Sequence, residues 1–62
     1  MTLEDLIQRL DTNTIIRVVN VHTVFYGSVR DYTDIVLAKR YVRAIFHYPN
    51  ELLITLEATS RE

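Results

Sequence analysis

The residues best suited to contact a nucleic acid follow one another closely in the second half of the chain. Lys39, Arg40 and Arg43 supply positive charge, and Tyr41 supplies an aromatic ring. Because cations contact phosphates and aromatic rings stack on bases, the 39–47 segment is a candidate nucleic-acid interface. The competing interpretation is a helix end whose dipole is compensated by Lys39 and Arg40, followed by a half-solvated strand. We favour the second interpretation, with nucleic-acid binding as the alternative.

The remaining polar residues predict neither a metal site nor a catalytic centre. His22 and His47 are the only histidines, and a structural zinc site takes four ligands that usually include cysteine, which is absent. Two pairs of carboxylates stand where helices are expected to begin: Glu4 with Asp5, and Asp31 with Asp34. The helix dipole already accounts for acids at such positions, and neither a nucleophile nor a glycine-rich phosphate loop accompanies them. We therefore expect a non-enzymatic protein without a cofactor.

The aromatic side chains form a third group with a potential binding role. They are Phe25, Tyr26, Tyr32, Tyr41, Phe46 and Tyr48. Tyrosine and arginine are the residue types that anchor protein interfaces, although ordinary packing under a helix is the alternative for any one of them. The candidates for a partner interface or self-interface are Tyr26, Tyr41, Arg43 and Ile45.

The first half of the chain predicts a helix and two strands that would position these residues. Apolar residues at helical spacing predict a helix over residues 3–10: Leu3, Leu6, Ile7 and Leu10. Thr2 is the expected N-cap, with Asp5 in the first turn. Residues 14–21 and 24–30 are predicted strands, joined by a hairpin turn at 20–23.

The second half predicts another helix and two more strands. Asp31 is the expected cap of a short helix over residues 32–39 or 32–40, with Tyr32, Ile35 and Val36 on its apolar side. From Tyr41 the residues alternate, which places Val42, Ala44, Phe46 and Tyr48 on one face and Tyr41, Arg43, Ile45 and His47 on the other. Pro49-Asn50 marks a turn before a last strand over 52–58 and a polar tail over 59–62.

These elements predict an α+β fold in a single domain covering residues 1–62. The order is helix, two strands, helix, two strands (αββαββ). Two hairpins and two short helices favour a four-stranded, mostly antiparallel sheet with both helices on one face.

The size and composition of the chain predict self-association. It has 62 residues, 48% of them hydrophobic, and no cysteine with which to form a disulfide. Ordering such a chain costs about 90 kcal/mol, and burial of its apolar surface returns about 90 kcal/mol on area scaling. A lone monomer is therefore marginal. We expect a homo-oligomer, with a dimer favoured.

Charge and patterning indicate the cytoplasm and no membrane span. The formal net charge is −1 and the pI is near 6.1, without the basic excess typical of a DNA-coating protein. The N-terminal residues lack the basic start and apolar run of a signal peptide. Arg17, Asn20 and His22 interrupt the longest apolar stretches. The absence of cysteine is consistent with a reducing compartment.

Three stretches of the chain carry a resemblance to a known group of proteins. They are Thr2-Leu3-Glu4-Asp5-Leu6-Ile7 through Thr14-Ile15-Ile16-Arg17-Val18, Phe25-Tyr26-Gly27-Ser28-Val29-Arg30-Asp31, and Leu52-Leu53-Ile54-Thr55-Leu56-Glu57. These stretches are similar to small proteins carried by bacteriophages and prophages. The resemblance implies phage origin and expression inside a bacterial host, and it brings no catalytic residues. By analogy of size and origin with anti-CRISPR proteins, an inhibitor of a host factor is one expectation.

Two hypotheses of function follow. The first is a non-enzymatic protein-binding module that self-associates and occupies a host or phage protein. The alternative is a small nucleic-acid-binding module that uses Lys39, Arg40, Tyr41 and Arg43. An enzyme would require a polar pocket that the sequence does not predict.

Overall fold

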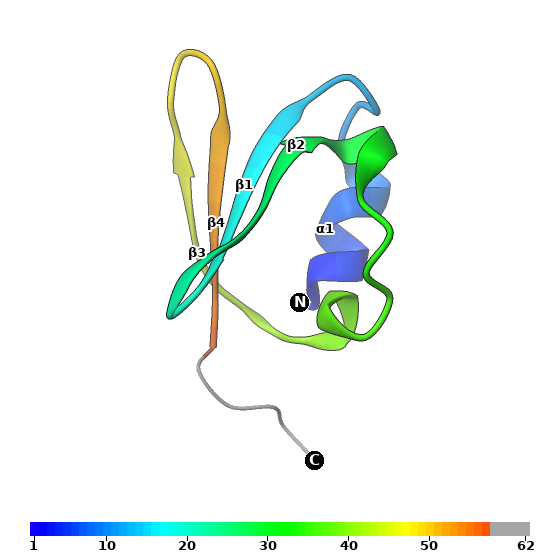
Figure 1. Cartoon of the computed structure of the whole chain (residues 1–62), viewed down its shortest axis with the longest axis vertical. Coiled ribbons are helices and arrows are strands. Elements are labelled where there is room, and N and C mark those ends of the chain that lie inside the picture. The colour runs from blue at the N-terminus through cyan, green and yellow to red at the C-terminus, as the bar shows by residue number, and fades with distance from the viewer. Residues whose placement is uncertain (58–62) are drawn as a thin grey trace.

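The structure, a computed structural model, describes residues 1–57, so the predicted tail at 59–62 and the predicted strand end at Ala58 lie outside it. One α-helix precedes four strands and two 3-10 segments (Figure 1). In chain order the elements are α1 (Leu3–Arg9), β1 (Ile15–Asn20), β2 (His22–Ser28), η1 (Val29–Asp31), η2 (Leu37–Lys39), β3 (Val42–His47) and β4 (Leu52–Leu56). With only seven residues, α1 is much shorter than the roughly 20 residues that a membrane-spanning helix needs, and no other helix of residues 1–57 qualifies.

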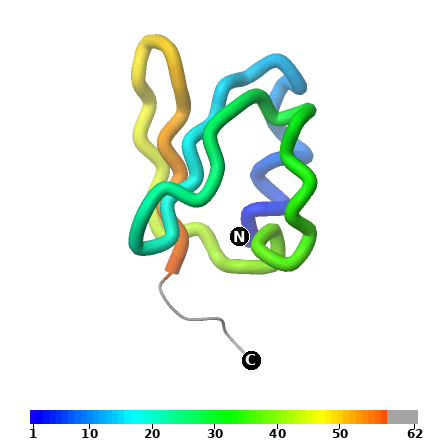
Figure 2. Tube along the Cα trace, viewed as in Figure 1, coloured from blue at the N-terminus to red at the C-terminus, as the bar shows by residue number. Residues whose placement is uncertain are grey.

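The four strands form one sheet in the order β2-β1-β4-β3. The outer pairs, β1 with β2 and β3 with β4, are antiparallel, whereas the central strands β1 and β4 are parallel. The predicted α+β fold with a mostly antiparallel four-stranded sheet is therefore confirmed. Because β2 and β3 are the two edges, residues 29–41 have to cross the sheet between them (Figure 2).

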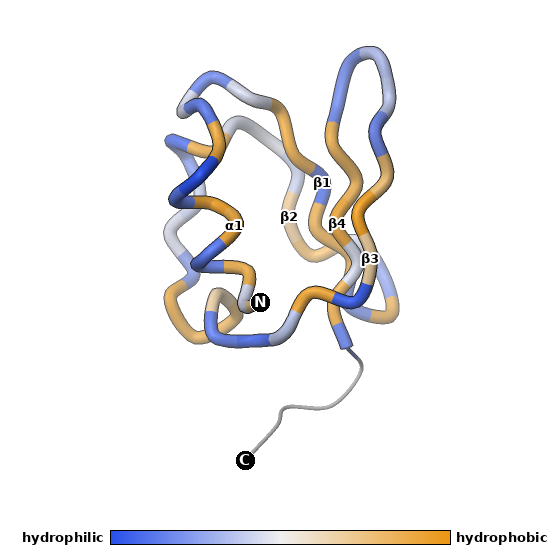
Figure 3. The backbone as a smooth tube through the Cα atoms, turned by 180° about the vertical axis from the view of Figure 1, so that it is seen from behind, coloured by the Kyte–Doolittle hydropathy of each residue, from blue (hydrophilic) through white to orange (hydrophobic). Residues whose placement is uncertain are grey.

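The core lies on one face of the sheet, under α1 and the connection that contains η2. Apolar residues line the side of α1 that faces the strands (Figure 3). Leu3, Ile16, Val18 and Ile54 are the largest side chains that are completely buried. The start of α1 is held by the predicted capping residue Thr2, whose hydroxyl accepts a hydrogen bond from the Asp5 amide.

The predicted second helix over residues 32–39 is wrong. Only two 3-10 segments, η1 and η2, occupy this region, and Ile35 and Val36 are 75% and 78% exposed instead of buried. The predicted cap Asp31 accepts a hydrogen bond from the Ser28 hydroxyl at 2.9 Å, and Asp34 caps only the short η2 turn through the Leu37 amide. The β-branched residues between these two turns disfavour helix, so α1 is the one α-helix that residues 1–57 place on the covered face.

The predicted alternation of β3 is also wrong, because a β-bulge interrupts it. Val42 pairs with Leu56, but Ala44 pairs with Thr55, so one residue of β3 has no counterpart on β4. From Ala44 onward every side chain is on the opposite face from the one that strict alternation gives. Ile45 consequently packs against the core, and Phe46 points away from it.

Candidate functional site: the open face of the sheet

The face of the sheet opposite α1 carries aromatic, apolar and charged side chains, and we call it the open face. Strand pairing places one row across all four strands: Tyr26, Arg17, Leu53 and Phe46. A second row runs beside it: Thr23, Val19, Thr55 and Ala44. No α-helix within residues 1–57 covers these rows, because α1 packs on the other side.

Two large aromatic side chains stand at the edges of the open face. Tyr26 on β2 is 57% exposed and Phe46 on β3 is 48% exposed. An aromatic residue in a folded core loses nearly all of its contact with water, so each of these retains roughly 100 Å² available for burial. About half of the surface of each of these two side chains is therefore left without contacts within residues 1–57.

An ion pair occupies the centre of the open face. The Nε atom of Arg17 lies 2.8 Å from the Oε2 atom of Glu51, and the guanidinium carbon lies 4.5 Å from the centre of the Tyr26 ring. The hydrogen bond to the Glu51 carboxylate raises the pKa of Arg17 above its ordinary value. Because the two charges neutralise each other, the middle of the face is neither strongly basic nor strongly acidic.

A groove of about 380 Å³ is formed at one end of the open face. Its lining comes from three strands and the turn after β1: Val19, Val21, Arg43, Ala44, Phe46, Thr55 and Leu56. Most of these side chains are apolar, and the Thr55 hydroxyl is turned toward the carbonyl oxygen of Ala44, to which it donates a hydrogen bond at 3.3 Å. The groove is therefore suited to apolar contact with a macromolecule.

The structure separates the four residues predicted for an interface. Tyr26 lies in the first row of the open face, and Arg43 lines the groove. Tyr41 lies outside β3, where it bridges to Thr2 beside α1. Ile45 lies on the covered face because of the bulge, so the predicted shared face of Tyr41, Arg43 and Ile45 does not exist.

The predicted nucleic-acid segment does not form one stacking surface. Lys39 belongs to η2, and the carbonyl of Arg40 accepts a hydrogen bond from the Leu3 amide at 2.9 Å at the start of α1. Of the residues proposed for phosphate contact, Arg43 alone is part of the groove lining. The segment is therefore divided between η2 with its C-cap Arg40 and the groove, which Arg43 lines.

Apart from Tyr26, no residue of the two rows was among the four predicted interface candidates, and Val21 was not among them either. Phe46 was assigned to the opposite face because a bulge leaves no mark in an alternating pattern. Val21 could have been noticed from the sequence. A tight hairpin turn that lies between β-branched residues and contains no glycine is unusual, and Val21 lies in that turn.

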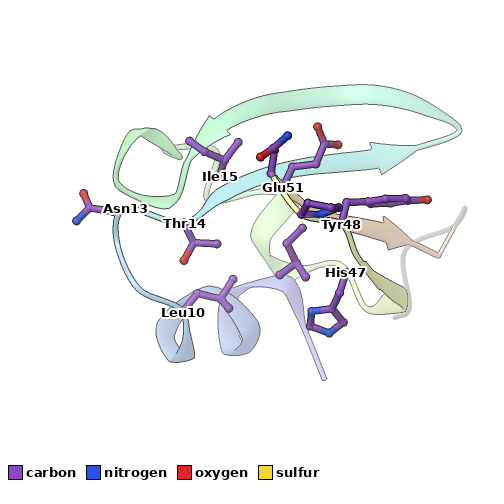
Figure 4. A pocket seen from close by; sticks show the side chains of 10 residues that line it. Leu10, Asn13, Thr14, Ile15, His47, Tyr48 and Glu51 are labelled. Atoms are coloured by element: carbon purple, nitrogen blue, oxygen red, sulfur yellow. The ribbon is translucent and has the colours of Figure 1, made fainter.

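A second hollow of about 530 Å³ lies between the 10–15 segment and the tip of the β3–β4 hairpin. Figure 4 shows His47, Tyr48 and Glu51 on one side of it and Leu10, Asn13 and Thr14 on the other. The Glu51 carboxylate is already bound to Arg17. Within residues 1–57 no group of three or more metal-ligating side chains is present. We therefore assign no reaction to this hollow.

Comparison with known proteins gives no indication of the function of this chain. No protein-family model, curated protein or solved structure matches it. The resemblance to small phage proteins thus stays a prediction, and the proposed function is based on the open face.

Proposed function

We propose that this chain is a non-enzymatic protein-binding module that forms a homodimer through the open face of its sheet. The observation that carries the proposal is the half-exposed pair Phe46 and Tyr26 on a face that no helix of residues 1–57 covers. Sheets with one apolar face exposed are stable when a second layer packs on them at about 10 Å. A second copy of the same face provides such a layer.

The size of the open face supports a second copy as the occupant. With about 4.8 Å per strand and 3.3 Å per residue, four strands of five to seven residues present a flat area of roughly 350 Å². A face-to-face pair covers about 700 Å² in projection, and the relief of the side chains adds to this. The total approaches the ~1,000 Å² that a specific interface needs.

Charge also favours a protein partner over a nucleic acid. The net charge of the chain is −1, and Arg17 in the centre of the open face is neutralised by Glu51. A surface that binds single strands instead combines its aromatic rings with a basic groove. Following the resemblance to phage proteins, we further propose that the dimer acts in a bacterial cytoplasm by occupying a host or phage protein.

Sedimentation of the wild-type chain and two variants tests the proposal. The wild-type chain is expected to show a mass near twice 7.3 kDa at high concentration, and Phe46→Glu is expected to be monomeric because each face then carries an unpaired carboxylate. Ile35→Glu is the matched control, because Ile35 is an exposed apolar residue outside the sheet. A wild-type chain that remains monomeric at every accessible concentration contradicts the proposal.

The same samples test the nucleic-acid alternative. Fluorescence anisotropy with a labelled oligothymidine at low salt should show no binding by the wild-type chain. Salt-sensitive binding that is lost in an Arg40→Ala, Arg43→Ala double variant would replace the proposed function with the alternative.

A further inference from the structure

The turn between β1 and β2 holds a valine in an unfavourable backbone conformation. Val21 has a φ of 72°, and it is the only residue other than glycine with positive φ within residues 1–57. It stands alone at the tip of the hairpin, since Asn20 pairs directly with His22. A β-branched side chain is a steric outlier in the left-handed region, where glycine or asparagine fits without a clash.

Among residues 1–57 we find no contact that compensates for this conformation. The Val21 side chain is 85% exposed, so its methyl groups bury almost no surface. The side-chain oxygen of the neighbouring Asn20 is buried and accepts no hydrogen bond in the structure. Two adjacent residues of the turn thus disfavour the fold of the monomer, which points to a contact that exists only in a complex.

The position of Val21 connects the turn to the open face. Val21 forms part of the groove lining, together with Val19, Phe46 and the floor residues Ala44 and Thr55. The most exposed large apolar side chain of residues 1–57 therefore lies beside the groove of the open face. In a two-fold pair of open faces, any contact that Val21 of one copy makes with the other copy is made a second time by the Val21 of that copy.

We propose that Val21 is a docking residue for a second copy of this chain, and that its turn keeps an unfavourable conformation because the contact is made in the dimer. This inference rests on the proposed function. The occupant is a second copy because an equal face laid on the ~350 Å² of one face brings the buried area close to that of a specific interface. The two Val21 contacts then lie within a single closed interface.

Two substitutions separate the backbone effect from the contact. Val21→Asn removes the apolar side chain and fits the left-handed conformation, whereas Val21→Thr keeps the β-branched shape and only makes the side chain polar. Both variants are expected to weaken self-association roughly tenfold in sedimentation equilibrium, because the contact loses its apolar surface.

Thermal melts of the same substitutions in a Phe46→Glu background give a second readout, because this background is expected to be monomeric. Val21→Asn should raise the melting temperature by about 5 °C through relief of the turn, and Val21→Thr should leave it within about 1 °C. Unchanged self-association of Val21→Asn overturns the inference, even if Phe46→Glu abolishes the dimer and so supports the proposed function.

Two further outcomes are also decisive. A wild-type chain that never dimerises overturns both proposals, and a higher melting temperature of Val21→Asn would then assign the turn to a different partner. A melting temperature that Val21→Asn lowers would show that the turn is not strained, which also overturns the inference.

Discussion

At the scale of single residues, the start of α1 depends on a reciprocal pair of hydrogen bonds. The Asp5 amide donates to the Thr2 hydroxyl, and the Thr2 amide donates to the Asp5 carboxylate, each at 3.2 Å. The second bond, followed by contact with the Thr2 side chain, lowers the pKa of Asp5 below its usual 3.8. The unfolded chain has neither bond, so ionisation of Asp5 favours the folded state.

This capping box predicts a specific loss of stability in acid. The contribution of Asp5 is complete above its unfolded pKa and disappears as the pH falls through the lower folded pKa. Urea unfolding at pH values on both sides of 3.8 should therefore show a smaller acid-dependent loss in Asp5→Asn than in the wild-type chain. Glu4→Gln, in the same turn but outside the capping box, should retain the wild-type profile.

The Tyr32 side chain has a ring that packs within the fold and a hydroxyl without a hydrogen-bond partner among residues 1–57. Its ring packs edge-on against Phe25 with the centroids 5.0 Å apart. Its hydroxyl oxygen is buried and makes no hydrogen bond in the structure, and burial, with a smaller effect of Asp34, raises the pKa of Tyr32 to about 12. The ring stabilises the fold, whereas the hydroxyl opposes it.

Tyr32→Phe should consequently increase the free energy of unfolding by about 1 kcal/mol, because it removes an unsatisfied polar group and keeps the ring. Above the ordinary tyrosine pKa of 10.0, the unfolded chain ionises first, so wild-type stability should fall toward pH 12 more steeply than that of the variant. Urea titrations in neutral and alkaline buffer measure both effects. Equal or lower stability of Tyr32→Phe would show that the hydroxyl has a partner.

At the scale of elements, the bulge in β3 decides which side chains the protein can offer to a partner. It turns Ile45 toward the core, where it contacts the buried cluster, and leaves Phe46 about half exposed on the other face. Strict alternation places these two residues the other way round. The composition of the open face is thus a consequence of one unpaired residue between Val42 and Ala44.

Alanine substitutions test this assignment directly. Ile45→Ala should lower the free energy of unfolding by about 2 kcal/mol, because a partly buried core side chain is lost. Phe46→Ala should cost clearly less when both are measured by urea unfolding at concentrations where the chain is monomeric. The reverse order would mean that β3 pairs with β4 without a bulge.

At the scale of the whole molecule, the stability of the monomer is limited because only one face of its sheet is covered. The accessible surface of the chain is 4392 Å², close to the about 4,200 Å² expected for a folded protein of this mass. The surface area is therefore close to that of an ordinary folded protein of this mass, and the exposed aromatic side chains do not result from a loose fold. Within residues 1–57 a single α-helix covers one of the two faces of the sheet, so the other face remains for a partner.

Stability of the wild-type chain should therefore depend on its concentration. If the dimer contributes to stability, the melting temperature should rise by roughly 5–10 °C over a hundredfold increase in concentration, as mass action requires. Phe46→Glu should melt at one temperature throughout the series, and Ile35→Glu should follow the wild-type chain. A wild-type melting temperature that is independent of dilution would remove the thermodynamic basis of self-association.

Local patterns were sufficient for the helix at residues 3–9, the approximate positions of the four strands and the α+β class. The spacing of Leu3 and Leu6, the cap at Thr2 and the β-branched run of β1 depend on neighbours a few residues away. Such short-range regularities are visible in any linear pattern. The same reasoning identified Tyr26 and Arg43 as binding candidates, and both are at the open face.

Features that depend on contacts between distant segments required the folded chain. The parallel pairing of Ile16 with Leu52, the bulge that exchanges Ile45 and Phe46, and the positive φ of Val21 all arise from strand register. The sequence of β3 alternates in the same way whether the strand pairs with β4 in regular register or with a bulge, so the sequence alone does not reveal the bulge. Side-chain identity sets the preferences of each segment, but pairing with another strand selects the face that each side chain occupies.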